Sequence, residues 1–410
     1  MISHRCRHCG LPLEHTVIDL GHQPPSNSYL TPEQLLCPEI TYPLRVYVCV
    51  GCWLVQLPAH AKADELFTAD YAYFSSTSSS WCAHAERFVG VAAERLDLGP
   101  DSLVVELASN DGYLLEHVQR RGIPCLGIEP THATAEAARA KGITTLERFF
   151  GKALAEDLVA VGGPAEGRAD LVVANNVLAH VPDINDFVAG MAALLKPSGR
   201  ASLEFPHLLR LLQGNQFDTI YHEHYSYLSL RVVRRIAAEA GLEVVDVEQL
   251  ATHGGSLRVW LAHQGSATPS EAVAAVLAAE ACLEDPEAFR GFQRRAEAAK
   301  HGLLAFLLQS RQEGKQVLGY GAAAKGNTLL NYAGIRPDLL PAVADRATSK
   351  QGLCLPGSHI PVISPEQLLA RQPDALMVFP WNLIEELRQQ LPGQELVTAI
   401  PELRRWRGEG

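Results

Sequence analysis

The sequence has no apolar run long enough to cross a bilayer, and its most apolar helical segment, around residues 272–283, is interrupted by Glu280. It also has no apolar leader: the first ten residues, MISHRCRHCG, are polar and include two cysteines, which argues against a signal peptide. Positive charge is in deficit, with 35 Lys and Arg against 46 Asp and Glu and a formal net charge of −11. That balance disfavours nucleic acid and anionic membranes as partners, while a local basic pocket for phosphates stays compatible with it. We therefore expect a cytoplasmic protein without nucleic-acid or membrane partners, and separately we expect a monomer.

A disulfide framework is not expected either, because the nine cysteines are an odd number and no secretion signal accompanies them. Four of them form two CxxC pairs, Cys6 with Cys9 and Cys49 with Cys52. Two CxxC turns aim four thiolates at one ion and leave no open position, which predicts a structural Zn²⁺. The alternatives are a thioredoxin-like redox pair, which needs only one CxxC, and four unrelated cysteines.

The length of 410 residues, with 47% hydrophobic and 20% charged residues, predicts a soluble globular protein of two or three domains. In the middle of the chain, apolar strands alternate with helices. Strands are expected at residues 103–107, 125–128 and 170–174, and Asp183 is expected to cap a helix that ends near residues 196–199. Such alternation predicts a doubly wound parallel sheet that binds its ligand at the carboxyl ends of the strands.

The polar residues at those strand ends fit a class I methyltransferase that uses S-adenosylmethionine (SAM). The turn ASNDG after the first strand would bring backbone close to the methionine part of SAM, and Glu129 would accept hydrogen bonds from the ribose hydroxyls. Only one glycine stands in this turn, so a Rossmann-like domain with another ligand stays open. The candidate SAM-binding residues are Glu106, Ala108, Asn110, Asp111, Gly112, Glu129, Pro130, Asn175 and Asn176.

The segment QFDTIYHEHYSYLSL, residues 216–230, is the densest group of proton-transfer side chains in the chain. Histidine is a natural base for a moderately acidic C–H bond, tyrosine can donate to a developing oxyanion, and a carboxylate can orient an imidazole. A strand would place Tyr221, Glu223 and Tyr225 on one face, whereas a helical turn would group Tyr221, His224 and Tyr225. A polar hinge between domains is the alternative. His180 is expected to point toward the acceptor, and Tyr71 and Tyr73 either line the site or are surface residues.

After a long helical region broken near Asp285, a strand at residues 316–320 leads into GYGAAAKGN. This glycine-rich turn predicts a second Rossmann-like unit that binds phosphate, either of NAD or of another nucleotide. Arg258, in the segment HGGSLR, is a further candidate for phosphate or oxyanion contact.

Taken together, these segments resemble the SAM-dependent C-methyltransferases that act on nucleotide-linked deoxysugars in antibiotic pathways. The resemblance covers nearly the whole chain. It rests on both CxxC pairs and on QPPSNSYL, DYAYFSSTS, VVELASNDGYLLEHV, NNVLAHVPD, YHEHYSYLS, HGGSLRV and GYGAAAKGNTLLN, in that order.

The resemblance implies a dTDP-linked 4-keto-6-deoxyhexose as the acceptor, with methylation at the carbon beside the ketone, most often C3. It implies that His224 is the base, with Tyr221 and Glu223 beside it, and that His180 and one of Tyr71 or Tyr73 complete the pocket. The last domain would hold the nucleotide, with Lys325 and Asn327 near the diphosphate. Arg258, Tyr320 and Gly321 are further candidates for contact with the substrate.

We therefore expect an α/β protein in three parts: a zinc-binding module over residues 1–70, a class I SAM methyltransferase domain with the catalytic loop over residues 71–262, and a Rossmann-like domain over residues 263–410. Competing hypotheses are methylation at C5 or at an oxygen or nitrogen, an NAD-dependent nucleotide-sugar oxidoreductase, and a zinc-bearing binding module without catalysis.

Overall fold

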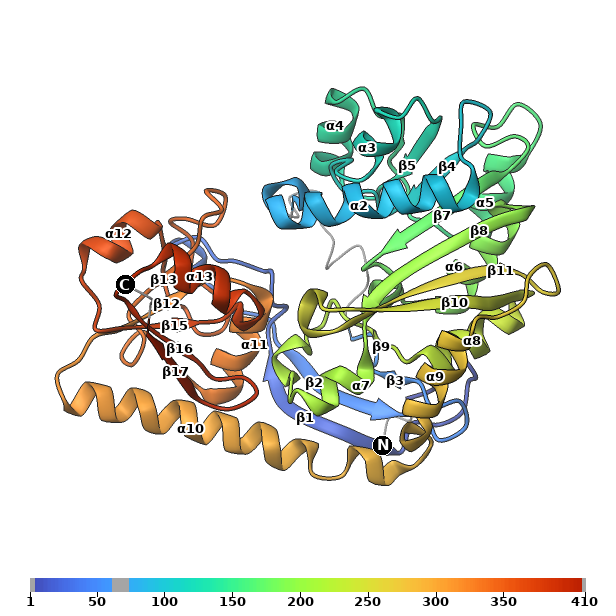
Figure 1. Cartoon of the computed structure of the whole chain (residues 1–410). Coiled ribbons are helices and arrows are strands. Elements are labelled where there is room, and N and C mark those ends of the chain that lie inside the picture. The colour runs from blue at the N-terminus through green and yellow to red at the C-terminus, as the bar shows by residue number, and fades with distance from the viewer. Residues whose placement is uncertain (1–3, 61–73, 408–410) are drawn as a thin grey trace.

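The computed structural model describes residues 4–60 and 74–407, and its strands form three sheets (Figure 1). The first sheet has the order β1-β2-β3-β9 and is antiparallel throughout. Its strands are β1 (His15–Gln23), β2 (Tyr42–Val48), β3 (Val55–Gln56) and β9 (Ser226–Tyr227). The fourth strand comes from the segment rich in tyrosine and histidine, because Val55 pairs with Tyr227 and Gln56 with Ser226. The N-terminal sheet therefore holds one end of that segment in place.

The second sheet has seven strands in the order β10-β11-β8-β7-β4-β5-β6. Strands β8, β7, β4, β5 and β6 are parallel, and β11 runs antiparallel between β8 and β10. The order reverses between β4 and β7, which makes the carboxyl ends of these two strands a topological switch point. The strands are β4 (Val104–Leu107), β5 (Cys125–Ile128), β6 (Thr145–Leu146), β7 (Ala169–Asn175), β8 (Leu195–Pro206), β10 (Leu242–Leu250) and β11 (Ser256–His263).

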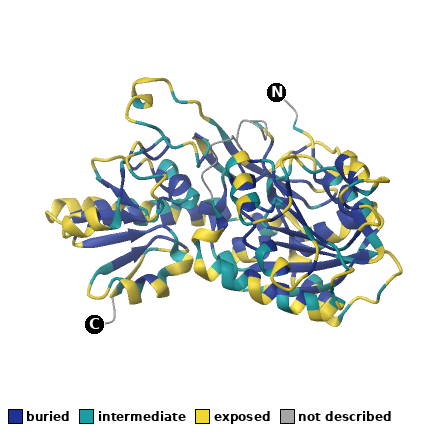
Figure 2. Cartoon of the chain, turned by 90° about the horizontal axis from the view of Figure 1, so that it is seen from above, coloured by how far each residue is buried: buried dark blue, intermediate teal, exposed yellow. Residues whose placement is uncertain are grey.

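Helices cover both faces of this sheet, as a doubly wound fold requires. Side chains of α2 (Ser79–Leu96), α3 (Leu115–Gln119) and α4 (His132–Ala140) build the core on one face. Those of α5 (Lys152–Val159), α6 (Ile184–Leu194), α8 (Leu230–Glu239) and α9 (Glu271–Ala279) build the core on the other. The buried strands between exposed helix faces are visible in Figure 2.

The C-terminus of α6 lies close to the predicted position, but residues 196–199, which were expected to form a turn, lie inside β8. Asp183 caps α6 by accepting a 3.0 Å hydrogen bond from the amide of Asp186. β8 begins at once with Leu195 opposite Ala169, and the register then jumps to Arg200 opposite Leu171. Residues 196–199 are therefore a bulge-like irregularity in a continuous strand.

The third sheet has the order β14-β13-β12-β15-β16-β17, parallel except for the edge strand β17, and confirms the second Rossmann-like unit. Its switch point lies between β12 and β15. The strands are β12 (Val317–Tyr320), β13 (Val343–Ala344), β14 (Val362–Ile363), β15 (Ala375–Val378), β16 (Glu395–Thr398) and β17 (Arg404–Arg407). Its helices are α11 (Ala324–Ala333), α12 (Pro365–Ala370) and α13 (Ile384–Gln390).

The long helix α10 (Phe292–Gln312) runs beneath the third sheet and the N-terminal sheet (Figure 1). Its buried residues share one core with β1, β2, α7 (Leu208–Gln213), α11 and one face of the third sheet. The first and last parts of the chain are thus packed together although they are far apart in sequence. Among the described residues, no helix is both long enough and apolar enough to cross a membrane.

Candidate active site

One pocket of about 720 Å³ lies where the two switch points meet. The turn after β4 and the end of β7 supply Ala108, Asn110, Asn175 and Asn176, and the opposite wall holds Ala324, Lys325, Pro380 and Asn382 from the third sheet's side. Both α/β units therefore open their ligand-binding ends into one space. A pocket between two such ends can hold two ligands facing each other.

The turn after β4 departs from the glycine-rich form, and its backbone shows what that departure means. Ala108 has φ of 53° and Asn110 has φ of 50°, the left-handed region that glycine adopts most easily. Gly112 has φ of 75°, and a Cβ there would lie 2.4 Å from Cδ1 of Ile143. The chain keeps the glycine-type backbone at Ala108 and Asn110 and retains glycine only where packing excludes a side chain.

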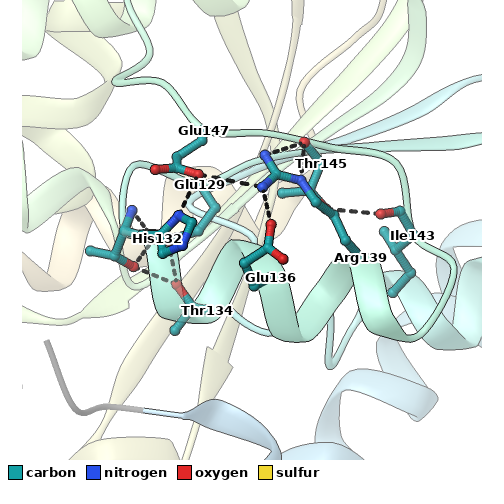
Figure 3. Close-up of polar contacts among 9 residues, drawn as sticks. Glu129, His132, Thr134, Glu136, Arg139, Ile143, Thr145 and Glu147 are labelled. Carbon is teal, nitrogen blue, oxygen red and sulfur yellow. Dashed lines mark hydrogen bonds and ion pairs between the residues drawn. The ribbon is translucent and has the colours of Figure 1, made fainter. Parts of the chain in front are cut away.

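Glu129 follows β5 and lines the pocket, and its carboxylate also fixes the turn. Oε2 accepts a 2.8 Å hydrogen bond from the amide of Asn110, and Oε1 accepts one of 2.9 Å from the amide of Thr131. Behind it, Arg139 of α4 donates to the carbonyl of Thr145 at 3.1 Å and so ties α4 to β6 (Figure 3). Oε1 of Glu129 also accepts from the hydroxyl of Thr131, so Oε2 is the oxygen that keeps a lone pair for a ligand.

Two further polar atoms at this end fit a ligand with N–H donors. The side-chain oxygens of Asn175 and Asn176 are buried, and neither has a hydrogen-bond partner among the described residues. Buried acceptors left without partners are costly, so a bound donor group would satisfy them. The amino and adenine N–H groups of SAM are donors of this kind.

Three of the predicted SAM residues do not line the pocket. Glu106 is 1% exposed inside the sheet, where burial first and the charges of Glu129 and Asp111 second raise its pKa. Asp111 accepts from Ser76, both from its amide at 3.3 Å and from its hydroxyl, and so anchors the 3₁₀ helix Ser75–Thr77 that precedes α2. Glu106, Asp111 and Gly112 therefore support the turn from behind, whereas Ala108, Asn110, Glu129, Pro130, Asn175 and Asn176 face the pocket.

The segment at residues 221–225 is a turn, so the strand alternative is wrong. Tyr221 and His224 share its pocket side, with ring centroids 4.0 Å apart, and His180 lies 4.6 Å from His224. Tyr225, expected on the same face, is instead 1% exposed in the interior under the guanidinium of Arg7. The turn thus presents one tyrosine and one histidine to the pocket and uses the next tyrosine for packing.

His224 is held as a neutral imidazole. Its Nδ1–H donates a 2.9 Å hydrogen bond to the carbonyl of Thr219, which leaves the lone pair on Nε2. Burial first, and the neighbouring His180 second, lower its pKa well below the usual value. His180 donates from Nδ1 to the carbonyl of Glu223 at 2.6 Å, and burial lowers its pKa to about 4. Both histidines are therefore neutral imidazoles at neutral pH.

The carboxylate of Glu223 does not orient an imidazole, contrary to the expectation. It accepts hydrogen bonds from the hydroxyl of Ser26 at 3.1 Å and from the amide and side chain of Asn27 at 3.1 and 3.0 Å. Burial raises its pKa, and these hydrogen bonds oppose the rise. Glu223 therefore fixes the segment QPPSNSYL, whose Asn27 lines the pocket.

On the opposite wall, Lys325 of α11 lines the pocket and donates to Oδ1 of Asn382 at 2.9 Å. A second cation, Lys350, also lines it and donates to the carbonyl of Ala322 at 2.8 Å. The other residues predicted in this turn point elsewhere. Asn327 is 1% exposed and donates to the carbonyl of Ser26, Tyr320 is buried in the core, and a Cβ on Gly321 would meet Pro380.

Arg258, a candidate for substrate contact, does not line this pocket. It is 6% exposed, absent from the pocket lining, and paired with Glu204 at 2.8 Å and with Glu248 at 3.2 Å. His84 also lies 2.8 Å from the Glu204 carboxylate. Burial raises the pKa of Glu204, but His84 and Arg258 lower it by more. The net pKa shift is therefore downward. The guanidinium therefore neutralises a buried acid.

Several residues that line the pocket were not predicted from the sequence. Trp81 stacks on His84 at 4.9 Å and lies 5.1 Å from His253, and both Trp81 and His253 line the pocket. His253 adopts φ of 54°, uncommon for a residue other than glycine, within the sequence HGGS. The two glycines after His253 are the feature of the sequence that could have indicated a loop close to the site. Arg148, Phe149 and Phe150 also line the pocket, whereas Tyr71 and Tyr73 lie outside the described residues.

The four CxxC cysteines form a cluster at the other end of the N-terminal sheet. Their sulfur atoms all lie within 4.8 Å of one another, with Cys6 and Cys52 at 3.4 Å and Cys9 and Cys49 at 3.4 Å. Four thiolates about 2.3 Å from a tetrahedral zinc lie roughly 3.8 Å apart. The donor set, the spacing and the closed shell fit a structural Zn²⁺.

Comparison with known proteins finds both family matches and individual relatives. Three family models match in succession: a zinc binding domain over residues 6–67, a methyltransferase domain over residues 82–247 and a C-methyltransferase C-terminal domain over residues 251–401. The C-methyltransferase NovU of Streptomyces niveus is 35% identical over 407 residues, which cover 97% of this chain and 96% of NovU. A ubiquinone biosynthesis O-methyltransferase of Burkholderia pseudomallei (strain 1710b) is 25% identical over 167 residues, 38% of this chain and 70% of that protein.

Among solved structures, the magnesium protoporphyrin IX methyltransferase ChlM from Synechocystis PCC 6803 with bound SAM is similar to 45% of this chain. The match covers 79% of ChlM, with 16% identity and a TM-score of 0.32.

The seven-stranded order with its antiparallel β11, together with the methyltransferase-domain match, defines a SAM-dependent methyltransferase of class I fold. The end-to-end similarity to NovU makes the assignment narrower. The chain belongs to the family of C-methyltransferases that carry an N-terminal zinc-binding domain and a C-terminal C-methyltransferase domain.

Proposed function

We propose that this C-methyltransferase acts on a dTDP-linked 4-keto-6-deoxyhexose and methylates the carbon beside the ketone, at C3, in deoxysugar and antibiotic biosynthesis. The observation that carries the proposal is the pairing of His224 with Tyr221 in the pocket that both α/β units share. A proton next to a ketone is acidic enough for a protein base, and carbon methylation requires its removal.

The chain's own residues divide the work as follows. Nε2 of His224 takes the proton from the carbon, and its Nδ1–H stays bonded to the carbonyl of Thr219. Tyr221 lies against His224 and would donate to the ketone oxygen as negative charge develops there. His180 adds a second neutral imidazole at 4.6 Å. When bound, SAM supplies an electrophilic methyl group for the resulting enolate carbon.

The two walls suit two different ligands. Glu129, Asn175 and Asn176, with the backbone at Ala108 and Asn110, would hold SAM through its hydroxyl, amino and adenine groups. Lys325 and Lys350, on the wall formed by the third sheet, would face the diphosphate of the acceptor. The N-terminus of α11, at Ala324, lies on the same wall and favours an anion.

Product mass spectrometry tests the proposal. The enzyme is incubated with methyl-labelled SAM and a panel of dTDP-4-keto sugars, and fragmentation places the label. Label on C3, with solvent deuterium entering the same position when SAM is omitted, supports the proposal. Label on C5 would mean that the enzyme methylates the other carbon beside the ketone, which contradicts the assignment to C3. Label on oxygen or nitrogen, without deuterium exchange, contradicts carbon methylation as a whole.

A further inference from the structure

A buried acid in the catalytic segment touches the opposite wall of the pocket. Asp218 belongs to the 3₁₀ helix Phe217–Thr219, is 1% exposed and accepts a 2.7 Å hydrogen bond at Oδ2 from the indole N–H of Trp381. Its second oxygen, Oδ1, has no partner among the described residues. Trp381 follows β15 in the last domain, 163 positions later in the chain. The indole therefore bridges the two α/β units.

The face of that indole carries the pocket lysine. Nζ of Lys325 lies 4.5 Å from the centre of the Trp381 ring, and Lys325 also donates to Asn382, the next residue after Trp381. Burial lowers the pKa of Lys325, and the charge of Asp218 opposes this shift. Burial likewise raises the pKa of Asp218 to about 6, against the attraction of Lys325. The position of the ammonium thus depends on the ring beneath it.

A third element encloses the same ring. A Cβ on Gly254 would lie 2.4 Å from Cη2 of Trp381, so the HGGS loop packs directly against the indole. The carbonyl of Gly254 accepts a 2.8 Å hydrogen bond from Gln216, two residues before Asp218. The catalytic segment therefore holds Trp381 at its N–H edge and, through Gly254, at its far edge.

The segment that grips Trp381 also fixes the base. Thr219, directly after Asp218, accepts the hydrogen bond from His224, and the carbonyl of Ile220 accepts one of 2.8 Å from Thr328 of α11. A shift of Asp218 would therefore move both the imidazole and the wall that carries Lys325.

We propose that Asp218 and Trp381 are positioning residues whose hydrogen bond holds the anion-binding wall at a fixed distance from the catalytic base. The proposal rests on the proposed function in one respect: the ligand of that wall is the diphosphate of a nucleotide-linked acceptor. The hydrogen bond is the essential feature, so any acceptor atom in the place of Oδ2 should preserve it.

Calorimetric binding of thymidine diphosphate and of SAM to full-length variants tests this. We expect Asp218→Ala and Trp381→Phe each to raise the Kd of thymidine diphosphate about tenfold and to leave the Kd of SAM within about twofold. Asp218→Asn should restore binding to within about threefold of wild type, because its amide oxygen can accept the indole N–H. The double variant Asp218→Ala with Trp381→Phe should be no weaker than the worse single variant.

Glu248→Ala is the matched control, since Glu248 accepts a 2.9 Å hydrogen bond from the indole of Trp260 away from the pocket. It should leave both dissociation constants unchanged. Wild-type affinity of Asp218→Ala for thymidine diphosphate, or an Asp218→Asn variant as weak as Asp218→Ala, overturns the inference while the proposed acceptor stands. If the wild-type enzyme does not bind thymidine diphosphate, the proposal of a nucleotide-linked acceptor is contradicted, and this inference is contradicted with it. If Asp218→Ala does not fold, Trp381→Phe and Asp218→Asn decide between the same outcomes.

Discussion

His224 donates from Nδ1 to the carbonyl oxygen of Thr219 at 2.9 Å, a bond that sets which ring nitrogen faces the pocket. With Nδ1 protonated, the basic lone pair sits on Nε2. Burial keeps the ring neutral, because the pKa of His224 lies well below its ordinary value. The proposed base therefore needs no change of protonation at neutral pH.

Replacing His224 by Asn should lower the rate of methyl transfer by about 10²- to 10⁴-fold, the usual contribution of a positioned base. Solvent deuterium incorporation next to the ketone should fall by the same factor, because both reactions need the same proton transfer. Mass spectrometry of the acceptor after incubation in heavy water measures the second effect.

His222→Asn is the matched control, because His222 is buried two residues away and packs edge-on against Tyr42, at 5.8 Å, outside the pocket. Its exchange rate should stay close to wild type. A His224→Asn variant that still exchanges deuterium at the wild-type rate would remove His224 as the base.

The pH dependence of kcat/KM should show no acid limb at the ordinary histidine pKa near 6.5. Since burial lowers the pKa of His224, its neutral form persists below that value, and the rate should begin to fall only at lower pH. Burial lowers the pKa values of His180 and His253 to about 4, so their protonation should also reduce the rate only at low pH. Initial rates between about pH 5 and 8, with zinc content checked at each point, measure the profile. A half-maximal rate at or above about pH 6.5 would contradict it.

The same histidines make stability depend on pH. Their folded-state pKa values lie below the unfolded value, so their stabilising contribution is complete above about pH 6.5 and is lost as the pH falls toward the folded values. Glu106, Asp218 and Glu223, whose pKa values burial raises, contribute with the opposite sign as the pH falls. The difference in melting temperature between wild type and His224→Asn, followed from about pH 8 to 5, isolates the histidine contribution and should change in favour of the variant as the pH falls.

Zinc removal should slow methyl transfer, although the four cysteines do not line the pocket. Cys49 and Cys52 lie in the connection between β2 and β3, and Val55 and Gln56 of β3 pair with β9, directly after the turn that carries Tyr221 and His224. Chelation, or Cys49→Ser, should disorder this sheet and reduce the rate at least tenfold. SAM should still bind, because its wall belongs to the second sheet. Cys37→Ser, an exposed cysteine outside the cluster, is the control and should keep full activity. Full activity at zinc contents near zero would rule out this coupling.

Arg258 and Lys325 were both predicted from the sequence to contact the acceptor. Replacing Arg258 should mainly reduce stability, whereas replacing Lys325 should mainly raise the KM of the acceptor. Arg258→Met leaves the buried carboxylate of Glu204 without its guanidinium and should cost about 3–5 kcal/mol of stability. Lys325→Met removes a cation that faces the pocket and should raise the acceptor KM about tenfold or more with little change in melting temperature. Denaturant unfolding and steady-state kinetics on both variants separate the two effects. An Arg258→Met enzyme of normal stability with a raised acceptor KM would reverse the assignment.

Much of the fold follows from local patterns in the sequence. The CxxC spacing, the alternation of strands and helices and the helix cap at Asp183 are properties of short segments, and each appears in the structure. Polar residues after buried strands also mark the ligand-binding edge, because parallel strands end at a common edge. Local rules therefore predicted Asn175, Asn176, Glu129 and Lys325 at the pocket.

The side-chain partners were decided only by the tertiary structure. Glu223 turns to Ser26 across 197 positions, and Asp218 reaches Trp381 across 163. Arg258 meets Glu204 because β11 and β8 pair in register. The sequence determined which groups could do chemistry and at which edge of each sheet they gather. Which of them face the ligand depends on how the sheets pack, since burial and pairing are set by contacts between segments that no local pattern contains.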